Sequence, residues 1–328
     1  QLNIKIMKTL LKTKIFTLLV ILFIFATSCS DDDNNTTAPP VDNTITGIAL
    51  KTADLSILVQ ALTKAELAVT LQGSGPFTVF APTNAAFTAF LSSAGYASVN
   101  DVPKAALTQI LLNHVVSGSV KSTDLTTTYI KTLAKGSAST ANPLSMFVNT
   151  AGGKVMLNGV ATVTNADIMA SNGVIHLVDN VIGLPTIVTH ATANPNFTAL
   201  VGALTGADQP DFVTILSGTG PFTVFAPTND AFTALNTELA PGGIASVSAA
   251  NLTKVLQYHV VSGNILAASL TEGQVVPTLQ TPQTFKVLLT GGAKIEDANA
   301  RIATIIATDV QCSNGVIHVL DKVLLPTF

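Results

Sequence analysis

Cysteine, arginine and tryptophan are scarce or missing in this chain of 328 residues, and each shortage excludes something. Only two cysteines occur, Cys29 and Cys312, and the chain has no tryptophan. Arg301 is the single arginine, and the net charge is negative, so the composition argues against a phosphate-binding surface and against nucleic acid as a partner. Without tryptophan and with three tyrosines, an aromatic platform that stacks sugar rings is not expected.

Charged side chains of either sign are also few. They make up 11% of the residues, against about 25% in ordinary soluble domains. The formal net charge is -3, and removal of residues 1–28 would take four lysines and no acid, leaving twelve basic residues against nineteen acidic ones. Apolar residues make up 48%, enough for two cores in a chain of this length. We therefore expect two domains with a polar but largely uncharged surface.

The first 28 residues have the pattern of a cleavable export signal. Three lysines follow Met7, which we take as the true start, and precede an apolar run at 15–25. Eleven residues are too few to span a bilayer, where about 20 are needed. Small residues at 26–28 then lead to Cys29, an ending that resembles a lipobox. We expect 1–28 to be the signal peptide and Cys29 to carry lipid; a plain secretory signal cleaved nearby is the alternative.

A polar and acidic segment follows at 29–44. It has no large apolar side chains before Val41, so it cannot build a core, and we interpret it as a disordered tether. Its start, Ser30-Asp31-Asp32-Asp33, resembles the surface-export signal of Bacteroidota lipoproteins, although simple solvation would also explain three aspartates. The sequence thus predicts an outer-membrane lipoprotein exposed on the cell surface.

The rest of the chain consists of two copies of one domain. Three blocks recur in the same order: 76–87 with 221–232, 114–118 with 259–263, and 171–176 with 313–318. The first pair agrees at eleven of twelve positions, and the offset is 145 for the first two blocks and 142 for the third. The period is too long for a solenoid, so we assign two tandem domains, 45–186 and 187–328.

Helical signals come before strand signals in each copy. Leucine or valine at 55, 58, 59 and 62 has helical spacing, as do the apolar positions that lead to His114 and to His259, with Ser248 as an expected cap. Asn158-Gly159 between two short apolar runs predicts a hairpin, and 174–178 a final strand. Helices followed by an antiparallel sheet indicate an α+β fold. The second copy's first helix is expected near Asn196, after a connection that buries apolar residues at 187 and 188.

Together, the TVFAPTNDAF block, the histidine-bearing helix and the NGVIHVLDKVLLP block resemble the fasciclin domain family. The resemblance covers nearly all of 45–328. It implies a wedge-shaped antiparallel β-sandwich with helices packed along one side, and a role in adhesion at cell surfaces or in matrix. The family's Tyr-His motif, linked to adhesion, is present as Tyr258-His259, whereas the first copy has Asn113 before His114.

The polar motif residues have a structural interpretation beside a functional one. His114 and His259 lie on apolar helix stripes, where a buried, hydrogen-bonded histidine is expected rather than a ligand. His176 and His318 each precede an aspartate by three positions, on opposite faces of a strand, so the two cannot share a metal without a bulge. Helix caps are expected at Thr83, Asn84, Thr228, Asn229 and Asp230, the last being the family's acidic position. Cys312 is expected to be a buried, inert thiol without a disulfide partner.

No nucleophile elbow, zinc-binding helix motif, CxxC pair or phosphate loop occurs. We therefore predict no enzyme activity, no cofactor and no metal site. The expected function is a non-enzymatic adhesion or binding module with an extracellular protein or polysaccharide as ligand. The alternative is an accessory lipoprotein that captures polysaccharide beside an outer-membrane nutrient importer.

Overall fold

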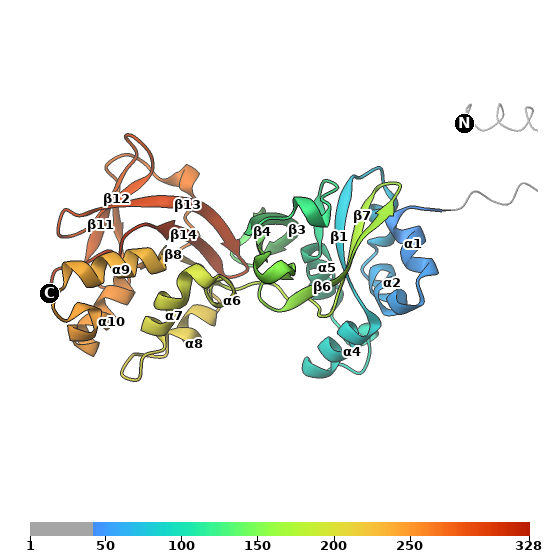
Figure 1. Ribbon diagram of the computed structural model, residues 1–328, viewed down its shortest axis with the longest axis horizontal. Helices are drawn as coiled ribbons and strands as arrows, with labels where there is room; N and C mark the ends of the chain where they lie inside the picture. The colour runs from blue at the N-terminus through green and yellow to red at the C-terminus, as the bar shows by residue number, and fades with distance from the viewer. Residues whose placement is uncertain (1–41) are drawn as a thin grey trace, which may run out of the picture. The chain divides into compact units, whose positions relative to one another are not determined.

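A computed structural model describes residues 42–328 (Figure 1). Its four clusters of buried apolar side chains are all built from residues between 45 and 325, so this part of the chain carries its own cores. Two clusters belong to the first copy and two to the second. The signal peptide, Cys29 and the acidic segment Ser30 to Asp33 lie outside the described residues.

The first copy begins with short helices and ends in a sheet. Its helices are α1 Ile45–Lys51, α2 Ser56–Lys64, α3 Ala68–Gln72, α4 Asn84–Ser93 and α5 Lys104–Asn113. Its strands are β1 Phe77–Pro82, β2 Val115–Ser117, β3 Thr128–Gly136, β4 Ser139–Asn149, β5 Met156–Leu157, β6 Ala161–Ala170 and β7 Gly173–Val178. The seven strands close into a barrel in chain order.

The second copy repeats this arrangement. Its helices are α6 Ile187–Ala193, α7 Thr198–Leu204, α8 Phe212–Ser217, α9 Asn229–Glu238 and α10 Ala249–Tyr258. Its strands are β8 Phe222–Pro227, β9 Val260–Ser262, β10 Val275–Pro277, β11 Thr284–Leu288, β12 Lys294–Glu296, β13 Ile302–Cys312 and β14 Gly315–Leu320. They form an open sheet in the order β10-β11-β12-β13-β14-β8-β9. Helices α7, α8, α9 and α10 lie along one side of this sheet (Figure 1).

The sequence pattern predicted that the strands come late in each copy, and the structure shows that one strand of each copy comes early. The TVFAP block forms β1 and β8, which precede two of the helices and each pair with a strand on both sides. Strand β1 pairs in parallel with β7, and β8 with β14, whereas the other strand pairs are antiparallel. The block is buried along almost its whole length, so it lacks the alternation that marks a half-buried strand.

Close backbone contact explains the Asn-Gly that opens each final strand. A Cβ on Gly173 would lie 1.9 Å from the carbonyl oxygen of Phe77, and one on Gly315 would lie 2.1 Å from that of Phe222. Only glycine allows β7 and β14 to approach the parallel partner this closely. The other Asn-Gly pair makes the predicted hairpin: Asn158 and Gly159 have φ values of 49° and 69° between β5 and β6.

One helix boundary in the second copy differs from the expectation. Residues 187–193 form α6 rather than a connection, so the first helix begins at Ile187 and not near Asn196. Thr186 caps it through its side chain, which accepts from the N–H of Thr189. Ile187 is buried in the core of the second copy, and Val188 packs against that core. Helix α6 is the counterpart of α1, at the offset of 142.

Polar contacts join the β3–β4 hairpin to the second copy. The Ser137 hydroxyl and the Ala138 N–H both donate to the carbonyl oxygen of Ser313, each at 2.9 Å. The Gln311 N–H donates to the hydroxyl of Ser145 at 3.0 Å. These contacts fall on the end of β13 and on the turn that leads into β14.

Within 42–328 no single helix has the length and apolar composition to cross a membrane. One pair of helical segments, Ile45–Lys51 with Ala53–Lys64, meets that test jointly but is bent by 111°.

Candidate functional site

The two helix histidines hold the end of each domain to its helix layer. His114 follows α5, and its Nε2 accepts from the N–H of Ile182 at 2.9 Å. His259 follows α10, and its Nε2 accepts from the N–H of Leu324 at the same distance. In each case the Nδ1 lies within 2.8 Å of the carbonyl oxygen four residues earlier, Ile110 or Val255.

These contacts fix one tautomer and keep the imidazoles neutral. Because Nε2 accepts from a backbone N–H, the proton lies on Nδ1, which donates to the carbonyl. Both side chains are almost wholly buried, and burial lowers the pKa of His114 and of His259 to about 4. Neither imidazole is accessible to a large ligand in this arrangement.

Tyr258, the tyrosine of the Tyr-His motif, is fully buried. Its hydroxyl donates to the carbonyl oxygen of Thr284 at 2.7 Å and accepts from the N–H of Ala298 at 3.0 Å. In the first copy Asn113 takes the same place, with its amide nitrogen donating to Gly183 O at 2.9 Å. A direct contact between Tyr258 and a partner protein would therefore require the domain to open.

The strand histidines are joined to aspartates that the sequence reasoning did not single out. His176 Nε2 lies 2.9 Å from the carbonyl oxygen of Val120, and His318 Nε2 lies 2.8 Å from that of Ile265. The Nδ1 atoms accept from the N–H of Asp167 and Asp309, at 3.2 and 3.4 Å. Each of these aspartates has a positive φ at a bulge in β6 or β13, a distortion that periodicity does not reveal.

The aspartates three positions after those histidines accept hydrogen bonds from the neighbouring strand. Asp179 accepts from the N–H of Thr162 at 2.7 Å, and Asp321 accepts from that of Thr304 at 2.6 Å. They join the last strand to its neighbour and do not approach the histidines.

The Thr-Asn pairs at the starts of α4 and α9 connect helices. Thr83 and Thr228 cap them, accepting from Ala86 N and Ala231 N. The Oδ1 of Asn84 accepts from the N–H of Ile57 at 2.9 Å, which ties α4 to α2. Asn229 does the same for Ala199 at 2.9 Å, tying α9 to α7. Asp230, in the first turn of α9, is exposed, and so is its counterpart Ala85.

The asparagines of the two SNG blocks each make three side-chain hydrogen bonds, and the sequence analysis did not single them out as site residues. Asn172 donates to the carbonyl oxygens of Leu71 and Gly73, both at 2.8 Å, and accepts from the N–H of Ile45. Asn314 repeats all three contacts, with Leu216, Gly218 and Ile187. Each asparagine therefore holds the start of the first helix beside the end of the third. Both asparagines recur at the same place in the two copies, and this repetition was the sequence signal that could have identified them.

Cys312 is fully buried, and its thiol lies 3.5 Å from the carbonyl oxygen of Val310. Burial raises the pKa of the thiol well above its usual range. The side chain is part of the core of the second copy and is a free thiol.

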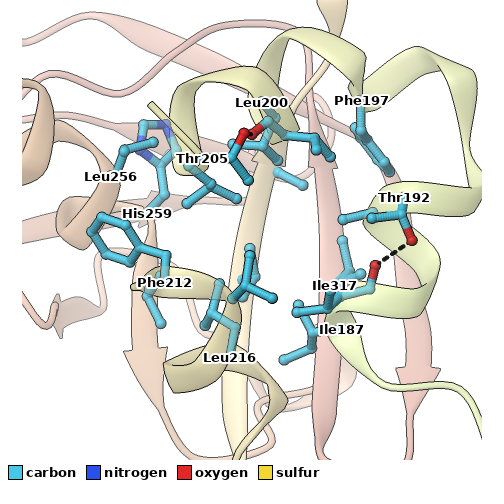
Figure 2. A pocket seen from close by; sticks show the side chains of 18 of the residues that line it. Ile187, Thr192, Phe197, Leu200, Thr205, Phe212, Leu216, Leu256, His259 and Ile317 are labelled. Atoms are coloured by element: carbon cyan, nitrogen blue, oxygen red, sulfur yellow. Dashed lines mark hydrogen bonds between the residues drawn. The ribbon is translucent and has the colours of Figure 1, made fainter. Parts of the chain in front are cut away.

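A small apolar cavity lies between the helices and the sheet of the second copy (Figure 2). Its volume is about 40 Å³, and it is lined by α6, α7 and α8 with His259 at one end. The corresponding space in the first copy is about 10 Å³ and is lined by His114. Neither volume would hold more than a few atoms, so these are packing gaps rather than binding sites for a ligand of ordinary size.

Among residues 42–328, no three histidine, cysteine, aspartate or glutamate side chains gather closely enough to hold a metal ion. The histidines of the motifs lie apart from one another, each with backbone partners of its own. What recurs in both copies is a framework of buried polar residues that joins helices to strands.

Comparison with known proteins decides the family. The model of the fasciclin domain matches residues 53–185 and 195–326. The chain belongs to the fasciclin family. Among similar proteins, protein sll1483 of Synechocystis sp. is 45% identical over 143 residues, which are 43% of this chain and 73% of that protein. The transforming growth factor-beta-induced protein ig-h3 of Oryctolagus cuniculus is 30% identical over 267 residues, covering 78% of this chain and 35% of its own length.

The fasciclin fold is also found in a solved structure. That structure is a FAS1 domain pair from the insect cell adhesion molecule Fasciclin I, with a TM-score of 0.52 and 20% identity, covering 83% of this chain and 97% of the other. The predicted fold class, two tandem α+β fasciclin domains, is confirmed. The sequence analysis expected a wholly antiparallel sheet, and this part was wrong, because each domain contains one parallel strand pair.

Proposed function

We propose that this protein is a non-enzymatic adhesion or binding module held at the outer membrane by a lipid on Cys29. The observation that carries the proposal is the pair of fasciclin domains, because a domain pair of this fold belongs to an insect cell adhesion molecule. Within the described residues, His114, His259 and Cys312 are buried with backbone partners, an arrangement suited to stability rather than to catalysis. The ligand is an extracellular protein or polysaccharide.

The surface location rests on the sequence alone. A lipobox-like ending before Cys29 and the Ser30-Asp31-Asp32-Asp33 segment support lipidation and outward display of the Bacteroidota type. The domain limits 45–186 and 187–328 belong to the same proposal; the helices α1 and α6 that start them lie before the segments matched by the family model.

An adhesion assay with treated surfaces tests the proposal. Beads coated with residues 42–328 are applied to cells of the producing organism and to its neighbours, and retention is compared with beads that carry the heat-denatured fragment. Retention that disappears after protease treatment of the cells supports protein-mediated adhesion. Retention that disappears after periodate treatment supports the alternative of polysaccharide capture beside an importer. Equal retention of native and denatured beads on every surface would refute a binding function for the domains.

A further inference from the structure

The first domain contains an ammonium group held by three carbonyl oxygens. Lys64, the last residue of α2, donates to the carbonyl oxygens of Val99 at 3.0 Å and Val102 at 2.6 Å, and also to that of Asn100. These carbonyls belong to the single 3-10 turn Val99–Asp101 and the residue after it. The three N–H donors of a lysine are thus all used on one short stretch of backbone.

The second domain has a 3-10 turn at the corresponding place, but no lysine occupies the position of Lys64. Helices α2 and α7 align at the offset of 142, since Thr63 donates to Val59 O and Thr205 donates to Val201 O in the same manner. The residue after Thr205, which takes the place of Lys64, is Gly206. The three residues that change the offset to 145 follow in the connection to α8.

The 3-10 turn itself is retained in the second domain and is one residue longer there. At the offset of 145, the residues that hold Lys64 correspond to Ile244, Ala245 and Val247, in and just after the turn Gly243–Ser246. The N–H of Val247 donates to Ile244 O at 3.0 Å, as the N–H of Val102 donates to Val99 O at 3.2 Å. The residue after the turn has ψ of 127° in the second domain and 128° in the first.

An open cleft occupies the space where the lysine would lie. It has a volume of about 490 Å³ and is lined by Gly206, by Ile244, Ala245 and Val247, and by parts of α7, α9 and α10. Its walls include the apolar side chains of Phe232 and Leu252, and its polar groups include Asp208, Gln209 and Asn236. Asp208 is the one charged residue in the lining, and no lysine or arginine is present there. This volume is within the range of ordinary ligand sites.

We propose that this cleft binds a primary ammonium group, the end of a lysine side chain presented by a partner protein. The ammonium donates to the carbonyl oxygens of Ile244, Ala245 and Val247, as Lys64 does to their counterparts. Asp208 supplies the opposite charge, and the methylene stem of the incoming lysine packs on Phe232 and Leu252. The proposal stands independently of lipid anchoring and of adhesion, since it follows from the comparison of the two domains.

The test uses residues 42–328, because all of the cores lie within them. The probe is n-butylammonium chloride, and the readout is the NMR shift of the amides of Gly206 and 244–247. We expect saturable shifts, with binding at least about tenfold weaker for tetramethylammonium, which has the charge but no N–H donor. Equal responses to tetramethylammonium or to potassium chloride would show a nonspecific cation effect and overturn the proposal.

Two reciprocal substitutions provide the decisive controls. A Cβ on Gly206 would lie no closer than 3.4 Å to its neighbours, so Gly206→Lys can be accommodated and should fill the cleft from within. We expect this variant to lose butylammonium binding and to melt about 2–4 °C higher, whereas Gly206→Met, which lacks the donors, should not gain stability. In the first domain, Lys64→Gly should create a new saturable response at 99–102. Unchanged butylammonium binding in Gly206→Lys would refute the site. If Gly206→Lys does not fold, the absence of a new response in Lys64→Gly would refute it.

A further arm distinguishes the source of the ammonium. The peptide acetyl-Gly-Lys-Gly-amide should produce the same shifts as butylammonium, and its norleucine analogue should not. Binding of butylammonium without binding of the peptide would overturn the assignment to a partner's lysine and leave a site for small amines.

Discussion

The Nε2 of His259 accepts a hydrogen bond from the N–H of Leu324 across 65 residues of chain. This contact joins the helix that ends at Tyr258 to the last segment of the second domain, and Ile182 and His114 repeat it in the first. A buried backbone N–H without this acceptor would be left unpaired.

We expect His259→Ala to destabilise the protein by about 1–3 kcal/mol, because the Leu324 N–H loses its partner. His114→Ala should cost a similar amount through Ile182, which makes the two variants a matched pair. Urea unfolding followed by circular dichroism measures the free energy of unfolding, and the bead assay measures retention. A variant that keeps its stability and loses retention would make His259 a binding residue instead.

Stability should fall in mildly acidic solution because of the same histidines. The pKa of His114 and His259 is lowered to about 4 by burial, below the value of 6.5 for an exposed histidine. The unfolded chain therefore binds more protons between pH 6.5 and pH 4, and the free energy of unfolding decreases as the pH falls through that window. The upper limit is about 3 kcal/mol for each histidine.

Urea titrations at half-unit steps from pH 7.5 to pH 4 measure this effect. Carboxyl groups with lowered pKa, such as Asp167 and Glu272, contribute below about pH 4.5 and fall at the edge of the window. The pH dependence should be smaller in His259→Ala than in the natural sequence. A free energy of unfolding that stays constant from pH 6.5 to pH 4.5 would contradict the assignment of neutral, buried imidazoles.

Asn314→Ala should cost about 2–3 kcal/mol, because it leaves the carbonyl oxygens of Leu216 and Gly218 and the N–H of Ile187 without their partner. The matched control is Asn314→Asp, which keeps an acceptor for Ile187 but places a carboxylate opposite two carbonyl oxygens. We expect the aspartate variant to be no more stable than the alanine variant at pH 7. Calorimetric melting measures both, and a melting temperature unchanged by either substitution would show that Asn314 does not secure α6.

Cys29 should carry lipid. Metabolic labelling with an alkynyl fatty acid should mark the full-length protein and not Cys29→Ser, with Cys312→Ser as the control that keeps the label. Equal labelling of the natural sequence and Cys29→Ser would refute the lipoprotein proposal.

Outward display should depend on the acidic triplet. Replacing Asp31, Asp32 and Asp33 together with alanine should protect the protein from external protease on intact cells while lipid labelling persists. A control that replaces Asn34 and Asn35 with alanine should remain accessible. Protease access to the aspartate-free variant would show that export does not rely on this segment.

The sequence by itself determined the repeat, the family and most helices. Local features were enough for these, since a helix such as Ala249–Tyr258 has its cap at Ser248 and its apolar spacing within ten residues. The hairpin at Asn158-Gly159 was equally local, because two adjacent residues with positive φ set its turn.

Only the tertiary structure decided the parallel pairing of β1 with β7, the three contacts of Asn172 and the partners of the histidines. The strand pairing, the contacts of Asn172 and the contact of His114 with Ile182 join residues about 70 to 130 positions apart, and no local pattern encodes such contacts. The difference between Lys64 and Gly206 is of the same kind. Both residues are visible in the sequence, but the meaning of the exchange depends on the carbonyl oxygens that the fold brings to Lys64 and on the cleft that Gly206 lines in the second domain.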